Sequence, residues 1–380
     1  MKDLLVIKKK QELLIKNLAD CGKSFYDLKV SEYLSPVGWH VMHCLFIECV
    51  WIRKLFLNKT ILLNELKSNG DSINTPVKRR GINLPEFKEV FNLCVKEFKK
   101  NLDFIEKISE NKTKKNYLDI KYILKFLINH HSQHLETIKS IINIIQINKK
   151  NYLESTFQII NSNVFKIDPL IIKKGNYKYG ATDNTFSYDN EKPINNITIN
   201  SFKIAKNLIT VSQWLGFIKE SGYKRKELWT KKGWAWKNKY NISKPLNWIF
   251  LEERLSLCTH KGLVKPISNS PITHISLHEL EAFANWKALR IPHEIEWEIA
   301  SKKLTNINLV WEWCSNVFYP YNGFSAFPYK EYSKPWFNNN YYTLRGSSIY
   351  SEKEIRRRTF RNFYEPNIRH IFSGGRLCSN

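Results

Sequence analysis

The segment Asn129–Ile138, NHHSQHLETI, contains three histidines within five positions, a pattern that could bind a metal ion. On a helix, His130 and His134 are four residues apart, so their side chains share a face on which two imidazoles can bind one divalent metal. His131 points about 100° away from that face and is not an expected ligand. A zinc-protease HExxH site is excluded because His131 stands where that motif has its glutamate, the general base.

A reactive metal site needs a third protein ligand, and the segment SPVGWHVMHCLFIE offers His40 and His43. Its apolar face includes Val41, Leu45 and Ile47, so either histidine can face a helical core, and spacing leaves the choice open. Neutral imidazoles suit Zn, Cu, Fe and Ni alike, so spacing does not name the metal. An isolated histidine pair is as often structural as ligating. A second histidine-bearing helix favours metal binding, and three ligands leave the open positions of a catalytic site.

Four segments with helical apolar spacing surround these histidines. They are KKKQELLIKNLADC, WHVMHCLFIECVWIRKLFL, PEFKEVFNLCVKEFKKNLDFIEKI and YILKFLINHHSQHLETIKSIINII. Their polar connections predict a four-helix bundle over residues 1–155. The connection at 59–85 is long and rich in turn residues, which is typical of functional loops.

The second part of the chain, residues 156–380, has a different pattern. Ten of the twelve tryptophans lie beyond residue 200, and short β-like runs alternate with Gly, Asn and Pro turns. The clearest helix is SLHELEAFANWKALR, with Ser276 as its N-cap. We therefore predict a two-domain α+β protein whose boundary falls near 150–165.

Bulk composition limits the partners and the location. The net charge of +25 comes mostly from lysines scattered along the chain, which favours a solvated surface over a nucleic-acid groove. No segment approaches the ~20 apolar residues of a membrane span, and the apolar run at the N-terminus is too short for a signal peptide. Seven cysteines without a CxxC motif indicate reduced thiols. We expect a cytoplasmic protein that binds neither nucleic acid nor membrane.

The pairing of SPVGWHVMH with HHSQHLE resembles the EgtB-type sulfoxide synthases of ergothioneine biosynthesis. Further motifs follow in the family's order: GATDNTFSYDNEKP, PITHISLHELEAFANWKALRIPHEIEWEIA, VWEWCSN and RNFYEPNIRHIFSGGRL. The resemblance covers nearly the whole chain. It implies a DinB-like bundle over 1–155 and, over 156–380, a C-type-lectin-like domain of the formylglycine-generating-enzyme (sulfatase-modifying-factor) type.

The same resemblance implies a mononuclear nonheme Fe(II) site with His43, His130 and His134 as ligands, and so selects His43 over His40. The implied reaction uses O2 to join the sulfur of a thiol, cysteine or γ-glutamylcysteine, to C2 of the imidazole of hercynine, giving a sulfoxide. Three histidines fill one face of an octahedron. The other three positions suit the hercynine ring nitrogen, the thiolate and O2.

Gln133 and two tyrosines are further residues that the resemblance assigns. Gln133 would hydrogen-bond the hercynine imidazole; the alternative is a solvent-facing helix glutamine. Tyr329 and Tyr332 match the family's YxxY motif, in which the first tyrosine supplies a proton. The alternative is aromatic packing, and some branches of the family use tyrosines of the helical domain instead.

The motif RNFYEP gives Asn362, Phe363 and Tyr364 as binding residues for hercynine. Phe-Tyr replaces the family's Trp-Asp here, and an aromatic face can hold the trimethylammonium group by cation–π attraction of roughly 0.5–2 kcal/mol. In PVKRRG, Arg80 and then Arg79 are the candidates for binding the thiol substrate's carboxylates. The alternative for this basic run is a solvated loop.

Two other functions stay open from the sequence. One is a selenium-inserting relative, a selenoneine synthase. The other is a catalytically inactive, metal-binding, lectin-like scaffold, which the divergent 69–80 loop favours. A formylglycine-generating activity requires two closely placed cysteines, and Cys314 and Cys378 stand in unsuitable contexts, so Cys314 is interpreted as a buried thiol.

Overall fold

The computed structural model describes residues 2–110, 114–115, 118–149, 152–156 and 169–380. The chain forms two compact units: Met1–Ile145 with Ser351–Ile355, and Gln146–Tyr350 with Arg356–Asn380. Of the expected boundary region, residues 150–151 and 157–165 lie outside the described residues. No helix in the described ranges is long and apolar enough to cross a membrane.

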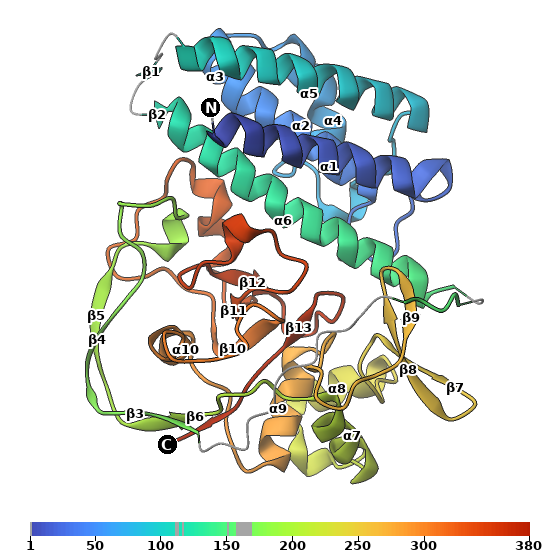
Figure 1. The fold of residues 1–380 in the computed structure, drawn as a ribbon, viewed down its shortest axis with the longest axis vertical. Helices are drawn as coiled ribbons and strands as arrows, with labels where there is room; N and C mark the ends of the chain where they lie inside the picture. The colour runs from blue at the N-terminus through green and yellow to red at the C-terminus, as the bar shows by residue number, and fades with distance from the viewer. Residues whose placement is uncertain (1, 111–113, 116–117, 150–151, 157–168) are drawn as a thin grey trace. The chain divides into compact units, whose positions relative to one another are not determined.

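The first unit is the predicted helical bundle. Its long helices are α1 (Lys2–Phe25), α2 (Val37–Glu48), α5 (Phe87–Glu110) and α6 (Ile120–Ile147). A π-helical turn, Cys49–Lys54, and α3 (Leu55–Leu57) extend α2. Figure 1 shows α1 and α5 side by side. Their apolar faces are buried, including Leu14, Leu18, Val90 and Phe98, so burial of one apolar stripe on each of these two helices stabilises the unit.

The connection at 59–85 differs from the expected loop because it contains α4 (Ile61–Gly70). This helix packs on α2, and Leu66 is its buried apolar anchor. A Cβ added at Gly70 would lie 2.5 Å from Cβ of Phe46, so glycine permits the close approach. A helix this short is marginal by itself, so the contact with α2 stabilises it. A short antiparallel pair, β1 (Lys114–Lys115) and β2 (Leu118–Asp119), precedes α6.

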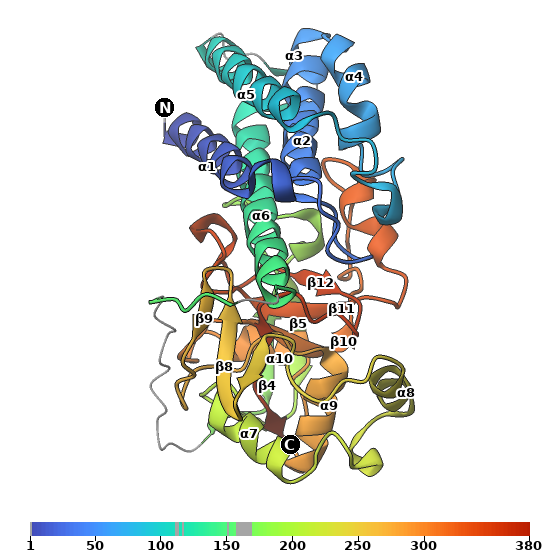
Figure 2. The same ribbon diagram turned by 90° about the vertical axis from the view of Figure 1, so that its right-hand side faces the viewer.

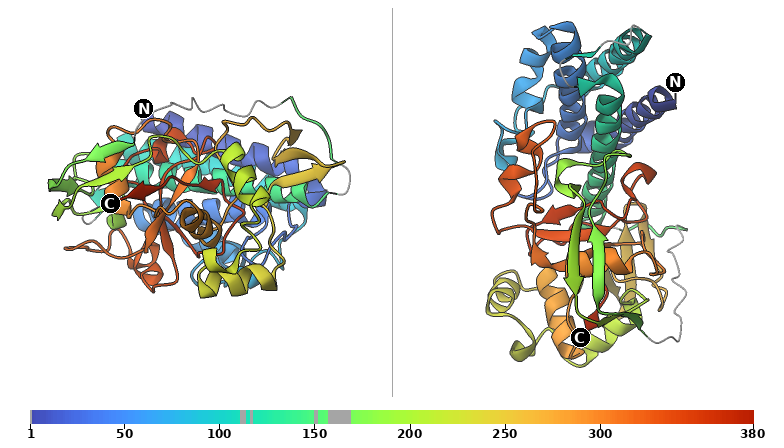
Figure 3. Two further views of the ribbon diagram at one scale, coloured as in Figure 1. Left: turned by 90° about the horizontal axis from the view of Figure 1, so that it is seen from below. Right: turned by 90° about the vertical axis from the view of Figure 1, so that its left-hand side faces the viewer.

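The second unit is built from small sheets. A four-stranded sheet has the order β12 (Asn362–Tyr364), β11 (Tyr342–Gly346), β10 (Trp311–Val317) and β13 (Ser373–Gly374), with β10 and β13 parallel. One three-stranded sheet joins β14 (Cys378–Ser379), β6 (Phe202–Ile204) and β3 (Leu170–Ile172). Another joins β7 (Trp248–Leu251), β8 (Arg254–Thr259) and β9 (Gly262–Val264). The antiparallel pair β4 (Gly175–Tyr179) and β5 (Asn195–Ile199) is the long green ribbon in the right-hand view of Figure 3.

The described residues of the second unit also form the α-helices α7 (Val211–Lys219), α8 (Lys231–Lys239), α9 (Leu277–Trp286) and α10 (Glu294–Ala300). Figure 2 shows α7 beside α9, where Trp214 stacks on Phe283 with ring centroids 4.8 Å apart. Ser276 caps α9, since its hydroxyl accepts the Glu279 N–H at 3.2 Å, as predicted. The mixed helix and sheet content confirms the α+β fold class.

A buried charge cluster fixes β12 in the second unit. The Arg361 guanidinium donates to both oxygens of Glu294, at 2.8 and 2.7 Å, and Arg345 donates to the same carboxylate at 3.2 Å. Burial raises the pKa of Glu294, but the two guanidinium groups outweigh it and hold that pKa below its ordinary value. Because a buried charge is costly without partners, this cluster anchors the chain directly before β12.

Candidate metal centre

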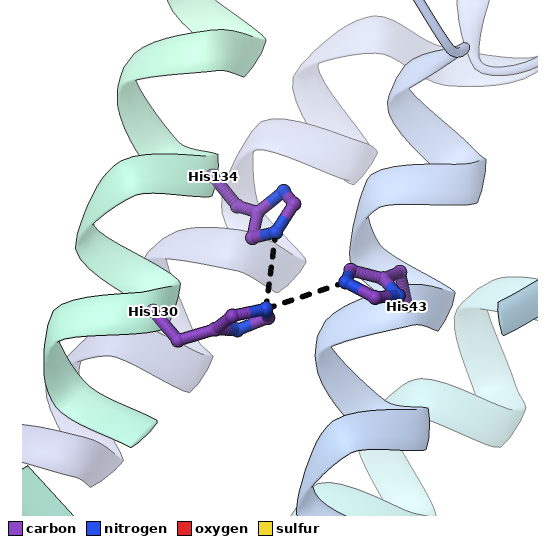
Figure 4. A group of neighbouring side chains, drawn as sticks. All are labelled: His43, His130 and His134. Atoms are coloured by element: carbon purple, nitrogen blue, oxygen red, sulfur yellow. Dashed lines mark hydrogen bonds between the residues drawn. The ribbon is translucent and has the colours of Figure 1, made fainter. Parts of the chain in front are cut away.

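Three imidazoles from two helices converge inside the bundle. His43 lies on α2, and His130 and His134 lie one turn apart on α6 (Figure 4). Nε2 of His130 is 3.3 Å from Nε2 of His43 and 3.2 Å from Nε2 of His134. One nitrogen from each ring lies within 4.8 Å of the other two. The expected trio is therefore a compact cluster that could hold one metal ion.

The two measured nitrogen–nitrogen distances are compatible with a shared ion. Metal–nitrogen bonds to histidine are about 2.0–2.1 Å long. At that length, nitrogens 3.2–3.3 Å apart subtend an angle of about 100° at one ion. This angle lies between those of octahedral and tetrahedral coordination, so the ligand set leaves room for further ligands.

Two of the three rings have a fixed orientation. Nδ1 of His43 lies 2.6 Å from the Gly70 carbonyl oxygen, to which only an N–H can donate. Nδ1 of His134 lies 2.9 Å from Nδ1 of His40. When each Nδ1 carries the proton, each Nε2 presents a lone pair to the cluster. Imidazole lone pairs that point into one cluster can bind a metal ion, so the donor set fits a metal.

Burial keeps these imidazoles neutral, which is the form that binds metals. It lowers the pKa of His43 to about 4, although the hydrogen bond to Gly70 opposes the shift. Burial also lowers the pKa values of His130 and His134 well below the usual range. His134 is the most exposed of the three, being half-buried where the other two are buried.

A second group of potential ligands, Cys44, His130 and His131, also lies within 4.8 Å. His130 belongs to both groups, but the other two members of this group are less suited to a metal. Nε2 of His131 is 2.8 Å from a carboxylate oxygen of Glu48 and is therefore occupied. Burial raises the pKa of the Cys44 thiol well above its ordinary value, and a protonated thiol is a poor ligand. The histidine trio is the better site.

Arg80 is linked to the trio through an aromatic ring. The Trp39 indole stacks on the His43 imidazole with ring centroids 4.8 Å apart and planes 8° from parallel. The Arg80 guanidinium lies 4.6 Å from the centroid of the same indole. Burial lowers the pKa of Arg80 to about 10. A cation that is partly desolvated near the cluster can recognise an anionic group.

The two candidate arginines differ in their hydrogen bonds and in their exposure. The Arg80 side chain donates to the backbone carbonyls of Thr75 and Ser72, each at 2.8 Å, which holds it in one orientation. Arg79 ends a 3₁₀ turn, Val77–Arg79, and its side chain is exposed. Arg80 is packed against Trp39 of α2, the helix that carries His43.

The remaining polar residues near the trio were not all expected. Gln133 is half-buried on α6, and its amide lies 3.5 Å from the Asn129 carbonyl oxygen. Sequence reasoning missed a role for His40, whose Nδ1 faces His134. Nε2 of His40 is buried and has no hydrogen-bond partner in the part of the chain that the structure describes. The signal for His40 was its place one turn before His43, which spacing alone could not interpret.

The expected tyrosines lie in the second unit. Tyr332 stacks on Tyr188 with ring centroids 4.2 Å apart, and Tyr329 meets Tyr332 edge-on at 6.4 Å. Burial raises the pKa of Tyr329, and the nearby Asp189 carboxylate raises it further, so its phenol keeps its proton. Asp189 also accepts a hydrogen bond from the Ser333 hydroxyl, which fixes the turn that carries both tyrosines.

The expected hercynine-binding residues form strand β12. Phe363 stacks on Phe318 with ring centroids 4.3 Å apart. The Tyr364 ring lies 6.2 Å from the His370 ring, and Asn362 accepts a hydrogen bond from the Phe363 N–H at 3.0 Å. All three β12 side chains are half-buried, so each retains exposed surface.

The cysteine pair of a formylglycine-generating site is not brought together. Cys314 is fully buried in β10, whereas Cys378 lies in β14 of another sheet. Burial raises the pKa of the Cys314 thiol well above its ordinary value. Cys314 is therefore a buried, protonated thiol.

Two family descriptions match different parts of the chain. Residues 7–138 match the DinB superfamily, and residues 163–306 match the sulfatase-modifying factor enzyme 1-like domain. A structure of PvdO from Pseudomonas aeruginosa aligns with a TM-score of 0.37 at 14% identity, over 56% of this chain and 93% of that chain.

Several curated proteins are also similar to this chain. A hercynine oxygenase of Mycobacterium tuberculosis is 27% identical over 244 residues, which cover 52% of this chain and 57% of the relative. One of Mycolicibacterium smegmatis is 28% identical over 196 residues, covering 39% and 45%. A formylglycine-generating enzyme of Thermomonospora curvata is 23% identical over 145 residues, covering 34% and 47%. The chain spans about half the length of the curated relatives it matches. The two domain matches and the hercynine oxygenases together confirm the resemblance of this chain to the EgtB-type sulfoxide synthases.

Proposed function

We propose that this protein is a hercynine oxygenase that joins a thiol sulfur to C2 of the hercynine imidazole and oxidises that sulfur to a sulfoxide. The observation that carries the proposal is the convergence of three neutral imidazoles inside a DinB-like bundle, in a chain with hercynine oxygenase relatives. The reaction balances with O2 as the oxidant. The C2–H and S–H bonds break, the C–S and S–O bonds form, and the second oxygen atom leaves as water with both hydrogens.

His43, His130 and His134 would hold the metal, which we propose to be Fe(II). When bound, Fe(II) supplies O2 activation and lowers the pKa of a coordinated thiol. The protein's own contribution is the rigid ligand set, since the Gly70 carbonyl and the His40 ring hold two of the imidazoles with Nε2 inward.

Arg80 is the proposed binding residue for the thiol substrate's carboxylate. Its guanidinium is fixed by two backbone carbonyls and stacked on Trp39, which itself stacks on His43. This pre-organisation reduces the entropy lost when a carboxylate binds. Arg79, the second candidate, would be the weaker contact because its side chain is exposed. Gln133 would donate its amide to the hercynine ring.

In the second unit, the aromatic faces of Phe363 and Tyr364 would hold the trimethylammonium group of hercynine, with Asn362 beside them. Tyr329, whose phenol is protonated at neutral pH, would supply a proton to the oxygen released as water and regain one from the hydrogens that the C2–H and S–H bonds release. Tyr332, stacked on Tyr188, would position that phenol and line the substrate site.

A product scan by mass spectrometry tests the function. The protein is loaded with Fe(II) without oxygen, mixed with hercynine and then exposed to O2. Cysteine, γ-glutamylcysteine or a selenosugar is offered in separate reactions, and His134→Ala serves as the matched control. We expect a sulfoxide whose mass is the sum of hercynine, thiol and O2 minus water. Full iron loading without any product from the three donors would refute the proposal and favour a scaffold.

A further inference from the structure

A buried carboxylate joins all four long helices of the bundle. Glu48, on α2, is completely buried. The Gln11 amide of α1 donates to its two oxygens at 2.9 and 3.0 Å, and the Asn101 amide of α5 donates to Oε2 at 2.8 Å. Nε2 of His131, on α6, lies 2.8 Å from Oε1. Burial of an unpaired carboxylate is costly, and these donors offset that cost.

The direction of the hydrogen bond from Asn101 to Glu48 is fixed from its far side. The Arg53 Nε–H donates to Oδ1 of Asn101 at 2.6 Å, so the Asn101 amide must turn its NH2 group to Glu48. Arg53 is itself held by an ion pair with Glu97 at 2.8 Å. Because Gln11 and Asn101 both donate, Glu48 is an acceptor in each contact, and the Nε2 of His131 that faces it must carry a proton.

His131 connects this hydrogen-bond network to the metal centre through its second ring nitrogen. Nδ1 of His131 lies 3.4 Å from Nδ1 of His130. In a neutral ring with a proton on Nε2, Nδ1 is an acceptor, so it receives the Nδ1–H of His130. Nε2 of His130 is then left with a lone pair, and it is this atom that faces Nε2 of His43 and His134.

We propose that Glu48 and His131 are positioning residues that hold His130 as the Nδ1–H tautomer, with Nε2 free to bind the metal. The inference rests on the proposed function only for the identity of the metal. This network of side chains distinguishes His130 from the other two candidate ligands. His43 is held by a backbone carbonyl and His134 by His40, whereas His130 is held through side chains from all four helices.

The isosteric variant Glu48→Gln gives a sharp test. Its amide oxygen can keep the contacts with Asn101 and Gln11, while its NH2 group faces Nε2 of His131. His131 must then accept at Nε2 and carry its proton on Nδ1, which forces His130 into the Nε2–H tautomer. Long-range ¹H–¹⁵N correlation spectra of metal-free, histidine-labelled protein report both tautomers directly, with signals assigned by single histidine substitutions.

We expect Nε2–H for His131 in the wild type and Nδ1–H in Glu48→Gln, with Co(II) affinity lowered roughly 10- to 100-fold. Glu352→Gln is the control, because it makes the same chemical change in the same unit at a carboxylate that bonds Lys10 rather than a histidine. That variant should keep the wild-type tautomer and bind Co(II) within about threefold of the wild type.

An Nδ1–H tautomer of His131 in the wild-type protein would overturn the inference, whether or not the variant folds. So would an unchanged tautomer in folded Glu48→Gln. The spectra involve neither hercynine nor thiol, so their outcome is independent of the product scan. A failed product scan with the expected tautomers would leave the positioning role intact and remove only the proposed reaction.

Discussion

Nδ1 of His43 lies 2.6 Å from the carbonyl oxygen of Gly70, so a residue at the end of α4 orients a candidate ligand on α2. The contact depends on how closely α4 approaches α2. That approach depends on glycine, since a Cβ at position 70 would lie 2.5 Å from Cβ of Phe46.

Gly70→Ala should therefore displace the end of α4 and release the His43 ring. We expect metal affinity to fall by roughly 10-fold or more, as it does when a partner of a ligand is lost. Gly216→Ala is the control, because a Cβ there meets its nearest neighbour, Trp286, at an ordinary 3.6 Å. Isothermal titration with Co(II) measures both variants. Wild-type affinity in Gly70→Ala would show that the Gly70 contact does not orient His43.

Removal of a ligand should abolish metal binding. We expect the wild type, prepared without oxygen, to bind about one Fe(II) per chain and His134→Ala to bind little or none. His278→Ala, a histidine of α9 beside Glu281, should bind iron as the wild type does. Metal analysis after gel filtration gives the stoichiometry. Full occupancy of the His134 variant would remove His134 from the ligand set.

Arg80→Gln should impair binding of the thiol much more than Arg79→Gln. A hydrogen bond to a charged group contributes about 1.5–3 kcal/mol, which corresponds to a 10- to 100-fold higher KM for the thiol. The KM for hercynine should change little. Steady-state kinetics with each substrate varied in turn separates the two effects. Equal KM values for the two variants would contradict the assignment of Arg80.

Tyr329→Phe should leave metal binding unchanged and shift the products from sulfoxide towards simple thiol oxidation. The phenol is the proposed proton source, and burial raises its pKa, so that it is protonated at neutral pH. Tyr177→Phe, whose hydroxyl donates to the Lys173 carbonyl at an exposed position, is the control. Mass spectrometry measures the ratio of sulfoxide to oxidised thiol in the wild type and in both variants. An unaltered ratio would place the proton source elsewhere.

Stability should fall in mild acid because two histidines of the second unit are buried in the neutral form. Burial lowers the pKa of His274 to about 3 and that of His370 to about 4. The unfolded chain takes up these protons near pH 6.5 while the folded chain does not, so the stabilising contribution is complete above that pH and is lost as the pH falls from 6.5. Each group should cost about 2 kcal/mol between pH 7.5 and 5.

Urea unfolding of the wild type and His370→Gln at both pH values measures this effect. The variant should lose about 2 kcal/mol less than the wild type on acidification. An identical loss in both proteins would mean that His370 is not buried in its neutral form.

Local patterns were sufficient to predict much of the structure. The four helical segments, the cap at Ser276 and the shared face of His130 and His134 follow from residue spacing within one turn of helix. The choice of His43 over His40 does not follow from residue spacing. Both lie on the same buried helix, one turn apart, and the family resemblance, not the spacing, selected His43.

Interactions between distant residues were not predictable. Glu48, Asn101 and His131 meet across three helices, and each looks alone like an ordinary polar residue of a helix. The helix α4 was missed because its ten residues have a weak apolar stripe and depend on contact with α2. Such features arise only when tertiary packing brings the partners together.

The short segment Ser351–Ile355 has a practical consequence for dissection of this protein. It belongs to the first unit, where Glu352 and Glu354 both accept from the buried Lys10 ammonium at 2.7 Å and the Ser351 hydroxyl bonds Glu136. A fragment that stops after α6 would strand the Lys10 charge in an apolar interior with neither counterion. The isolated helices would therefore not represent the first unit as it folds in the intact chain. A fragment would have to include Ser351–Ile355 as well.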